Sequence, residues 1–160
     1  MIILDTNVLS EALRPVPSEQ VLRWMGKVPA ASFYTTAITQ AEIFAGLAMM
    51  PEGARKTSLI TAATALLEID LGSRVLPFDS DAARLYPEIA VTRSRLGRPS
   101  SSFDLQIAAI ARSRGAALAT RNTGDFEHCG IEVVNPWVEG QSGGSRRRRR
   151  SPRPRPHPLY

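Results

Sequence analysis

The sequence predicts an α/β fold in which helices cover both faces of a mostly parallel central sheet. Two observations support this prediction. Short apolar, β-branched segments alternate along the chain with longer segments of helical periodicity. The first short segment, MIILD, is apolar on both faces, as a strand inside a parallel sheet must be. With 160 residues, of which 43% are hydrophobic, the chain is long enough to form one domain with its own core.

The expected strands and helices follow one another in alternation. Strands are expected at residues 1–5, 32–38, 75–78, 117–120 and 131–135. Helices are expected in the segments that begin at residues 7, 18 and 39, over 53–71, from about 80 to 96, and over 104–114. The longest of them repeats its apolar residues with the 3.6-residue period of an amphipathic helix.

Capping residues and prolines predict where several helices begin and end. Asn7 or Ser10 can cap the first helix, which must end near Pro15 because proline cannot continue it. Ser18, followed by an acidic residue, is expected to start the second helix. Pro87 is expected to kink or split the helix that contains it.

The net charge of +5 comes from the C-terminal segment. Residues 141–160 hold seven of the 20 Lys and Arg residues and no acid, so residues 1–140 carry 13 basic against 15 acidic side chains. The body of the protein is therefore slightly acidic, and its global charge gives no argument for nucleic-acid binding. The C-terminal segment is rich in Gly, Ser, Pro and Arg and cannot form a core, which predicts a domain over 1–139 and a disordered tail over 140–160.

Cysteine, histidine and hydropathy exclude several classes of protein. A single cysteine, Cys129, rules out a disulfide framework and a CxxC redox pair, and two histidines leave no His-based metal site. No apolar run approaches the roughly 20 residues needed to span a bilayer. The first residues lack the basic and then apolar pattern of a targeting segment. We therefore expect a soluble, reduced, cytoplasmic protein that has no membrane partner.

Four acidic residues fall where predicted strands meet helices or loops. Asp5 ends the first strand, and Glu42 lies in the first turn of the helix after the second strand. Asp104 begins the helix before the fourth strand, and Asp125 follows that strand. Carboxylates gathered at the carboxyl edge of a parallel sheet repel one another unless a cation neutralises them. Oxygen ligands without His or Cys favour Mg²⁺ or Mn²⁺.

Each of these acids also has a purely structural interpretation. Thr39 and Glu42 match the T-x-x-E capping box. Asp104 fits an acid favoured in the first turn by the helix dipole, and Asp125 fits a turn residue. Asp5 is harder to explain in this way, because a charge at the end of an apolar strand is costly to bury and no basic residue lies near it in the sequence.

Four motifs together resemble a known family. They are DTNVLSE at 5–11, TQAEIFAGL at 39–47, GRPSSSFDLQIAAIARSRG at 97–115 and LATRNTGDF at 118–126. In this order and spacing they resemble the PIN-domain ribonucleases, and most closely the VapC and FitB-type toxins of type II toxin–antitoxin modules. The resemblance covers residues 1–137 and implies a PIN-like three-layer sandwich with a mostly parallel central sheet.

The resemblance also implies an activity and a set of site residues. The activity is Mg²⁺-dependent endoribonuclease hydrolysis of RNA phosphodiester bonds, which leaves a 5′-phosphate and a 3′-hydroxyl. Asp5, Glu42 and Asp104 would be the acidic triad that holds the metal ion. Thr6 and Asn7 would support the triad through hydroxyl and amide contacts.

The fourth metal-site position stays open between two residues. The family places an acidic or amide residue in the segment that reads TRNTGDF here, and this segment offers both Asn122 and Asp125. Asn122 would orient the attacking water or a ligand, whereas Asp125 would hold a second ion. Charge favours Asp125, and the number of metal ions, one or two, is not fixed by the sequence.

Partners and alternatives complete the sequence-based expectations. The resemblance implies an RNA substrate, a cognate antitoxin and a homodimer, and the helix over 53–71 carries apolar surface that one sheet face cannot cover. The local arginines expected to anchor the substrate backbone are Arg98, Arg112, Arg114 and Arg121. The alternative is a catalytically inactive PIN-like binding module that acts through antitoxin or RNA association. Retention of all four acidic positions argues against it.

Overall fold

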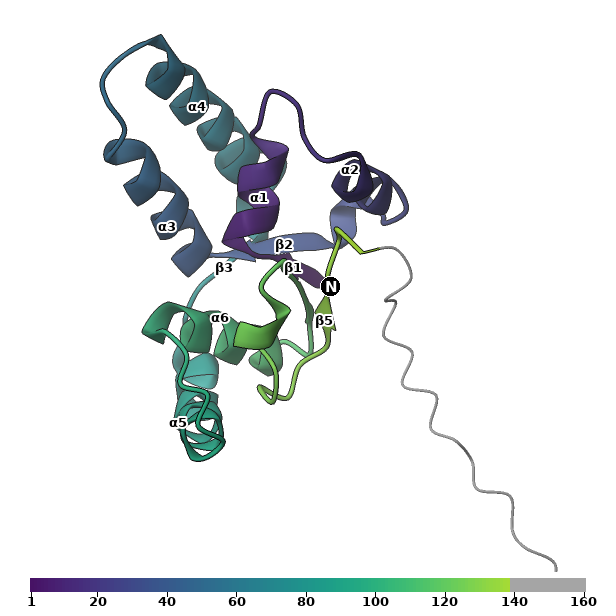
Figure 1. The fold of residues 1–160 in the computed structure, drawn as a ribbon, viewed down its shortest axis with the longest axis vertical. Helices are drawn as coiled ribbons and strands as arrows, with labels where there is room; N and C mark the ends of the chain where they lie inside the picture. Colours follow the sequence, from purple (N-terminus) through teal and green to yellow (C-terminus); the bar gives the residue numbers. More distant parts are fainter. Residues whose placement is uncertain (139–160) are drawn as a thin grey trace, which may run out of the picture.

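The protein, analysed as a computed structural model, contains a five-stranded parallel sheet with the strand order β3-β2-β1-β4-β5 (Figure 1). The structure describes residues 1–138. The boundary expected after residue 139 and the tail expected over 140–160 lie outside these described residues. The strands are β1 (Ile2–Leu4), β2 (Phe33–Thr36), β3 (Val75–Leu76), β4 (Ala117–Ala119) and β5 (Val133–Val134), and every pairing is parallel. This confirms the predicted sheet.

The helices form two layers, one on each face of the sheet (Figure 1). The bounds are α1 (Thr6–Ala12), α2 (Glu19–Gly26), α3 (Ala37–Ala48), α4 (Ala54–Thr64), α5 (Ser80–Arg95) and α6 (Ser102–Ser113). Helices α1 to α4 cover one face, and the antiparallel pair α5 and α6 covers the other. The predicted three-layer α/β/α sandwich is therefore confirmed.

Strand β1 joins the two hydrophobic cores of the sandwich. Because successive side chains of a strand point to opposite faces, Ile3 packs in the core under α5 and α6, whereas Leu4 packs in the core under α1 to α4. Both side chains are at most 2% exposed. Burying such a side chain stabilises the fold by about 1.5–3 kcal/mol, so β1 is fixed from both faces and its carboxyl end is a rigid place for a functional group.

The structure corrects two predicted helix starts. Helix α3 begins at Ala37 rather than at Thr39, and its N-cap is Thr36, whose hydroxyl accepts a hydrogen bond from the Thr39 amide at 3.0 Å. Glu42 therefore lies in the second turn, and the predicted capping box of Thr39 with Glu42 is wrong. Helix α1 begins directly after Asp5, so Asn7 lies inside it and does not cap it.

Of the other predicted helix boundaries, two agree with the structure and two differ from it. Helix α1 ends before Pro15, and Ser18 is the N-cap of α2, as predicted. The helix predicted over 53–71 is α4 followed by six residues of wider π-helical turns, η2 (Ala65–Asp70). Pro87 does not split α5, which is continuous and has Asp79 as its N-cap. Pro87 is exposed, so water can satisfy the carbonyl group that loses its helical donor.

The structure also describes the environment of Cys129 and the length and apolar content of the helices. Cys129 is free and 1% exposed, and burial raises the pKa of its thiol, as expected for an unreactive packing residue. Within residues 1–138, no helix is long and apolar enough to cross a membrane.

Candidate metal centre

Asp5 lies at the carboxyl end of β1 and is the N-cap residue of α1. Its side chain is 6% exposed, and two donors hold one of its oxygens, Oδ2. The Thr120 hydroxyl donates to this oxygen at 2.7 Å, and the Asn7 amide nitrogen Nδ2 donates at 3.1 Å. The parallel pairing of Leu4 with Ala119 places Thr120 beside Asp5. The sheet register therefore fixes the orientation of this carboxylate.

Asn7 and Thr120 belong to one hydrogen-bonded network around Asp5. Asn7 Nδ2 also donates to the Thr120 hydroxyl oxygen at 3.1 Å, and Asn7 Oδ1 accepts from the amide of Arg121 at 3.0 Å. The Thr120 oxygen accepts in addition from the amide of Asn122 at 3.1 Å. The network joins the start of α1 to the segment after β4, and this confirms that Asn7 contacts Asp5 directly.

Glu42 faces the start of α1 from the second turn of α3. The Thr6 hydroxyl donates to Glu42 Oε2 at 2.6 Å, a short bond between residues 36 positions apart in the chain. Glu42 is half-buried. The bond holds one carboxylate oxygen and leaves the other, Oε1, for a water molecule or a ligand.

Asp104 is the third residue of α6 and is held by the N-cap of that helix. The Ser101 hydroxyl accepts a hydrogen bond from the Asp104 amide at 3.1 Å and donates to Asp104 Oδ2 at 2.6 Å. The structural interpretation of Asp104 as a first-turn acid is therefore correct, and it is compatible with a role at the site. The reciprocal bonds orient the carboxylate at the start of a largely buried helix.

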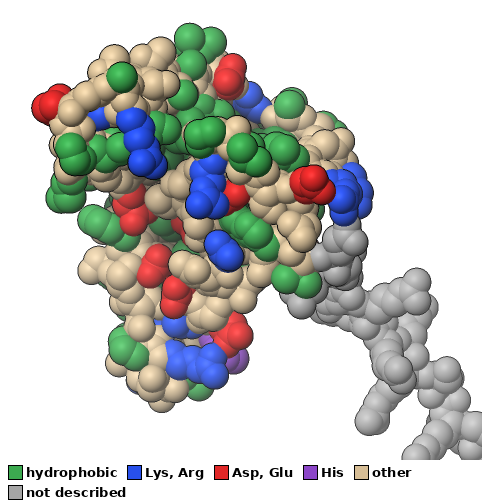
Figure 2. Space-filling model, turned by 45° about the horizontal axis from the view of Figure 1, so that its top comes forward, with side chains coloured by type: hydrophobic (Ala, Val, Ile, Leu, Met, Phe, Trp, Pro, Cys, Tyr) green, Lys and Arg blue, Asp and Glu red, His purple; other side chains and the backbone are tan. Residues whose placement is uncertain are grey.

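The electrostatics of Asp5 show that three acids lie near one another. Burial raises the pKa of Asp5, and the negative charges of Glu42 and Asp104 raise it further, while the Thr120 hydrogen bond lowers it. In the described part of the chain, no Lys or Arg forms an ion pair with any of these three carboxylates. Figure 2 shows several acidic side chains near the middle of the face between the two helical layers.

The three carboxylates fit a divalent cation by their chemistry. They are oxygen donors, they repel one another, and they lack a cationic partner among residues 1–138, so an ion would relieve the cost of burying Asp5. Among residues 1–138, however, no three acidic, His or Cys side chains are already arranged as a complete ligand set. Mg²⁺ suits such a site, because it is commonly held by one or two carboxylates and several water molecules.

The fourth predicted acid, Asp125, lies apart from this group. It ends the short 3₁₀ turn η4 (Thr123–Asp125), its side chain is exposed, and it is not among the groups that shift the pKa of Asp5. The competing residue Asn122 is also exposed, but its backbone amide joins the Thr120 network. The structure thus places Glu42 and Asp104 within electrostatic range of Asp5, bonds Thr6 to Glu42 and Asn7 to Asp5, and leaves Asp125 outside these contacts.

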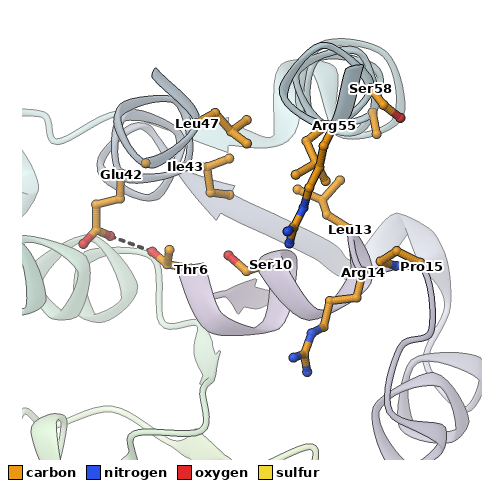
Figure 3. A pocket seen from close by; sticks show the side chains of 13 residues that line it. Thr6, Ser10, Leu13, Arg14, Pro15, Glu42, Ile43, Leu47, Arg55 and Ser58 are labelled. Carbon is orange, nitrogen blue, oxygen red and sulfur yellow. Dashed lines mark hydrogen bonds between the residues drawn. The ribbon is translucent and has the colours of Figure 1, made fainter. Parts of the chain in front are cut away.

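A groove of about 730 Å³ runs from this site between α1, α3 and α4. Figure 3 shows Thr6 and Glu42 bonded to each other at one end, and the guanidinium groups of Arg14 and Arg55 at the other. The lining is mainly apolar and is formed by Leu13, Pro15, Ile43, Gly46, Leu47, Leu59 and Ala62, with Ser10 and Ser58.

Two residues of the site were missed by the sequence analysis. Thr120 was included only as the end of a predicted strand, and Ser101 was not singled out. A signal was present for Thr120, because a polar residue directly after an apolar strand lies at the same sheet edge as Asp5 when the two strands are parallel neighbours. For Ser101 the signal was its place three residues before Asp104.

We expect Thr120→Val to weaken Mg²⁺ binding while the protein remains folded. The isosteric change removes the donor to Asp5 and the acceptor for Asn7, and loss of such an outer partner costs about 10–100-fold in metal affinity or activity. The measurement is the Mg²⁺ concentration that half-saturates the rise in melting temperature. Thr35→Val is the matched control, because Thr35 is equally buried but donates to the Leu4 carbonyl. Equal Mg²⁺ midpoints for both variants would contradict the assigned role of Thr120.

Comparison with known proteins defines the class to which this fold and site belong. The sequence matches the PIN domain over residues 2–131, and the chain therefore belongs to the PIN-domain family. VapC ribonuclease Y4jK from Sinorhizobium fredii is 40% identical over 137 residues, which cover 86% of this chain and 98% of that protein. Toxin FitB from Neisseria gonorrhoeae is 37% identical over 137 residues, which cover 86% of this chain and 99% of that protein.

A solved structure agrees with these relatives. The structure of FitAB bound to the IR36 DNA fragment contains a chain that matches this one with a TM-score of 0.83 at 36% identity, covering 89% of this chain and 99% of that chain. Within the PIN-domain family the protein is thus of the VapC/FitB type, as its four sequence motifs indicated.

Proposed function

We propose that the protein is a metal-dependent endoribonuclease and the toxic component of a type II toxin–antitoxin system. The observation that carries the proposal is the convergence of Asp5, Glu42 and Asp104 at one sheet edge without a cationic partner in the described chain. The names of two relatives, VapC ribonuclease Y4jK and toxin FitB, support the reaction and the biological class. Because the proposed substrate is cellular RNA, we propose the cytoplasm as its location.

The residues of the site divide the work of phosphodiester hydrolysis. A bound Mg²⁺ or Mn²⁺ ion would polarise the phosphate and lower the pKa of a bound water molecule. Asp5 and Asp104 would hold the ion directly, each with one oxygen already fixed by a hydroxyl donor. Glu42, whose Oε2 accepts a hydrogen bond from the Thr6 hydroxyl, would position the water or bind it through Oε1. Asp125 would contribute only if the turn that carries it moves closer to Asp5 when RNA binds.

Removal of the metal ion tests the proposal directly. We expect the protein to cleave single-stranded RNA in Mg²⁺, to lose cleavage in excess EDTA, and to recover it when Mg²⁺ or Mn²⁺ is restored. The control is a melting curve in EDTA, because the fold must survive removal of the ion. Undiminished cleavage in excess EDTA would refute the metal-dependent mechanism. Absence of RNA cleavage in every metal, with RNA or antitoxin still bound, would favour the inactive binding module instead.

A cognate antitoxin is the proposed protein partner. Solved structures similar to this chain include FitAB bound to the IR36 DNA fragment and, at 27% identity, VapBC-5 from Mycobacterium tuberculosis, a member of the VapBC family of toxin–antitoxin systems. The apolar groove beside Glu42 offers a surface for a segment of that partner. Co-expression of the neighbouring reading frame, followed by co-purification, tests the partnership, and failure of the two proteins to associate would contradict it.

We further propose that the protein is a homodimer. Several large apolar side chains of the described residues remain at least 47% exposed on the side of the sheet that carries α5 and α6, namely Val91, Leu96 and Phe103. Covering such side chains is favourable by about 25 cal/mol for each Å² removed from water. Light scattering at tens of micromolar protein should give twice the mass of the chain. A monomer without the antitoxin under these conditions would contradict the dimer.

A further inference from the structure

Arg121 lies over the indole ring of Trp137, with its Cζ atom 5.2 Å from the ring centroid. Arg121 follows the end of β4, and Trp137 follows the end of the neighbouring strand β5. Because the two strands are parallel neighbours, both residues lie at the carboxyl edge of the sheet, the edge at which Asp5 is found. Trp137 is partly buried and packs against the core under α1 to α4, so the face on which Arg121 rests is held in place.

The backbone of Arg121 is fixed by the network around Asp5. Its amide donates to Asn7 Oδ1 at 3.0 Å, and the other polar atom of the same Asn7 side chain donates to Asp5 Oδ2 at 3.1 Å. The preceding residue, Thr120, bonds to Asp5 directly. Arg121 is therefore positioned next to the site from two directions, by Asn7 through its backbone and by Trp137 through its side chain.

The charge partners of the local arginines single out Arg121. Four arginines were expected to anchor the substrate backbone. Within residues 1–138, three of them form ion pairs with carboxylates: Arg98 with Glu127, Arg112 with Glu88, and Arg114 with Asp79. In that same part of the chain no carboxylate pairs with the exposed guanidinium of Arg121, whose neighbour is an aromatic ring. Of the four, Arg121 is the one whose charge no carboxylate of residues 1–138 neutralises.

A guanidinium held over an aromatic ring is suited to bind a phosphate. The cation–π contact engages the side of the group that faces the ring and does not use its N–H groups as hydrogen-bond donors to a carboxylate. Two parallel N–H donors match two oxygens of a phosphate, and the contact with the ring restricts the side chain before the ligand arrives. This arrangement differs from a solvent-exposed arginine, which must lose its rotamer freedom when it binds.

We propose that Arg121, held over the ring of Trp137, is a binding site for a backbone phosphodiester of single-stranded RNA next to the phosphate that is cleaved. The inference rests on the proposed function, because it takes the substrate to be RNA. It assigns Arg121 to binding of the RNA chain along the sheet edge and Trp137 to positioning of Arg121. Neither residue is placed among the metal ligands.

The test measures binding of a fluorescently labelled, mixed-sequence single-stranded RNA to the full chain in EDTA over a range of salt concentrations. We expect Arg121→Ala to raise the dissociation constant roughly five- to tenfold and to reduce the salt slope by about 0.7, the value for one phosphate contact on a single strand. Arg121→Lys should keep the slope but bind more weakly than wild type, because it lacks the planar fork. Trp137→Leu should weaken binding at an unchanged slope, since no charge is removed.

The matched control is Arg84→Ala. Arg84 is exposed and lies in the first turns of α5. The start of α5 lies beside the end of α6, because Asp79 pairs with Arg114. Arg84 is therefore far from Asp104, which lies at the start of α6. This variant should bind RNA as wild type does, with the same slope. Melting curves check that Trp137→Leu is folded. If it is unfolded, Arg121→Ala and Arg121→Lys still test the inference, because Arg121 is exposed.

Two results would overturn the inference. One is an Arg121→Ala variant with wild-type affinity and slope, and the other is a folded Trp137→Leu variant with wild-type affinity. In cleavage assays we expect Arg121→Ala to raise KM by the same factor as the dissociation constant and to leave kcat within about twofold, as for a contact made equally in the ground and transition states. If the wild type binds RNA through Arg121 but cuts nothing, the proposed function fails and the phosphate site remains. If the wild type cuts RNA and the variants bind RNA with the affinity of the wild type, only the proposed phosphate site is refuted.

Discussion

Replacing Asp5 or Asp104 with asparagine is expected to lower metal-dependent RNA cleavage by about 1000-fold or more. Each substitution keeps the shape of the side chain and removes one negative charge from the group that would hold the ion. Metal-ion stabilisation of a phosphodiester transition state supplies several kcal/mol, and each 1.4 kcal/mol is a factor of ten in rate. Initial rates on single-stranded RNA measure the effect, and circular dichroism verifies the fold. Full cleavage by either variant would refute the assignment of these ligands.

The same substitution at Asp5 should increase stability. Burial raises the pKa of Asp5 above 3.8 in the folded protein, so the folded state holds this proton more tightly than the unfolded state does. The stability that this group contributes is therefore complete below 3.8 and is lost as the pH rises through the raised pKa. As the pH rises through the raised pKa, the ionised Asp5 becomes a cost, so the melting temperature of Asp5→Asn should rise relative to that of the wild type with increasing pH.

Added Mg²⁺ reverses the order of these melting temperatures. A ligand that binds only the folded state stabilises it by an amount that grows with the logarithm of 1 + [ligand]/Kd, so Mg²⁺ should raise the melting temperature of the wild type and not that of Asp5→Asn. Asp81→Asn is the control, because Asp81 is an exposed acid in the first turn of α5. This variant should keep both the Mg²⁺ response and the activity. A wild type that is indifferent to Mg²⁺ would show that the acids are not a metal site.

The sheet was predictable because its signals are local and strong. Ile3 and Leu4 belong to a run that only a strand buried on both faces explains, and the same reasoning found the other strands. Helix starts were less predictable, because competing caps lie close together in the chain. Thr36 and Thr39 are both suitable N-caps, and the extended backbone of Thr36, set by the end of β2, decides between them. Continuity of α5 through Pro87 depends on solvent exposure, which the sequence does not show.

The residues of the candidate site that lie in sequence motifs could be predicted. The residues whose position depends on strand pairing were harder to predict. Asp5, Glu42 and Asp104 each lie in a recognisable motif, and the structure brings them together. The role of Thr120 depends on which strand lies next to β1, a fact of strand order rather than of local sequence. Glu42 was assigned to a helix start on the basis of spacing, whereas its actual partner is Thr6, 36 residues away.

Arg93 is a buried arginine that no sequence motif distinguishes. A basic residue in the last turn of a helix is ordinary, yet this one is 3% exposed. Its Nε donates to the Ser100 hydroxyl at 2.8 Å, and its Nη1 donates to the carbonyls of Gly124 at 3.1 Å and Glu127 at 2.6 Å. The Ser100 hydroxyl in turn donates to the carbonyl of Asp125 at 3.1 Å. One side chain thus ties the loop before α6 to the turn that carries Asp125.

Arg93→Met is expected to destabilise the fold by about 3 kcal/mol, because it removes three part-buried hydrogen bonds that a buried charged group donates to the two loops. For a domain of this size the melting temperature should fall by about 10 °C. Arg95→Met is the matched control: Arg95 lies in the same turn but is exposed, and surface changes of this kind stay within about 0.5 kcal/mol. Arg93→Lys should fall between the two, since an ammonium group keeps the charge but cannot span both loops. If Arg93→Met and Arg95→Met melt together, water replaces the guanidinium at these carbonyls, and the loops that flank Asp104 are held by their own packing instead.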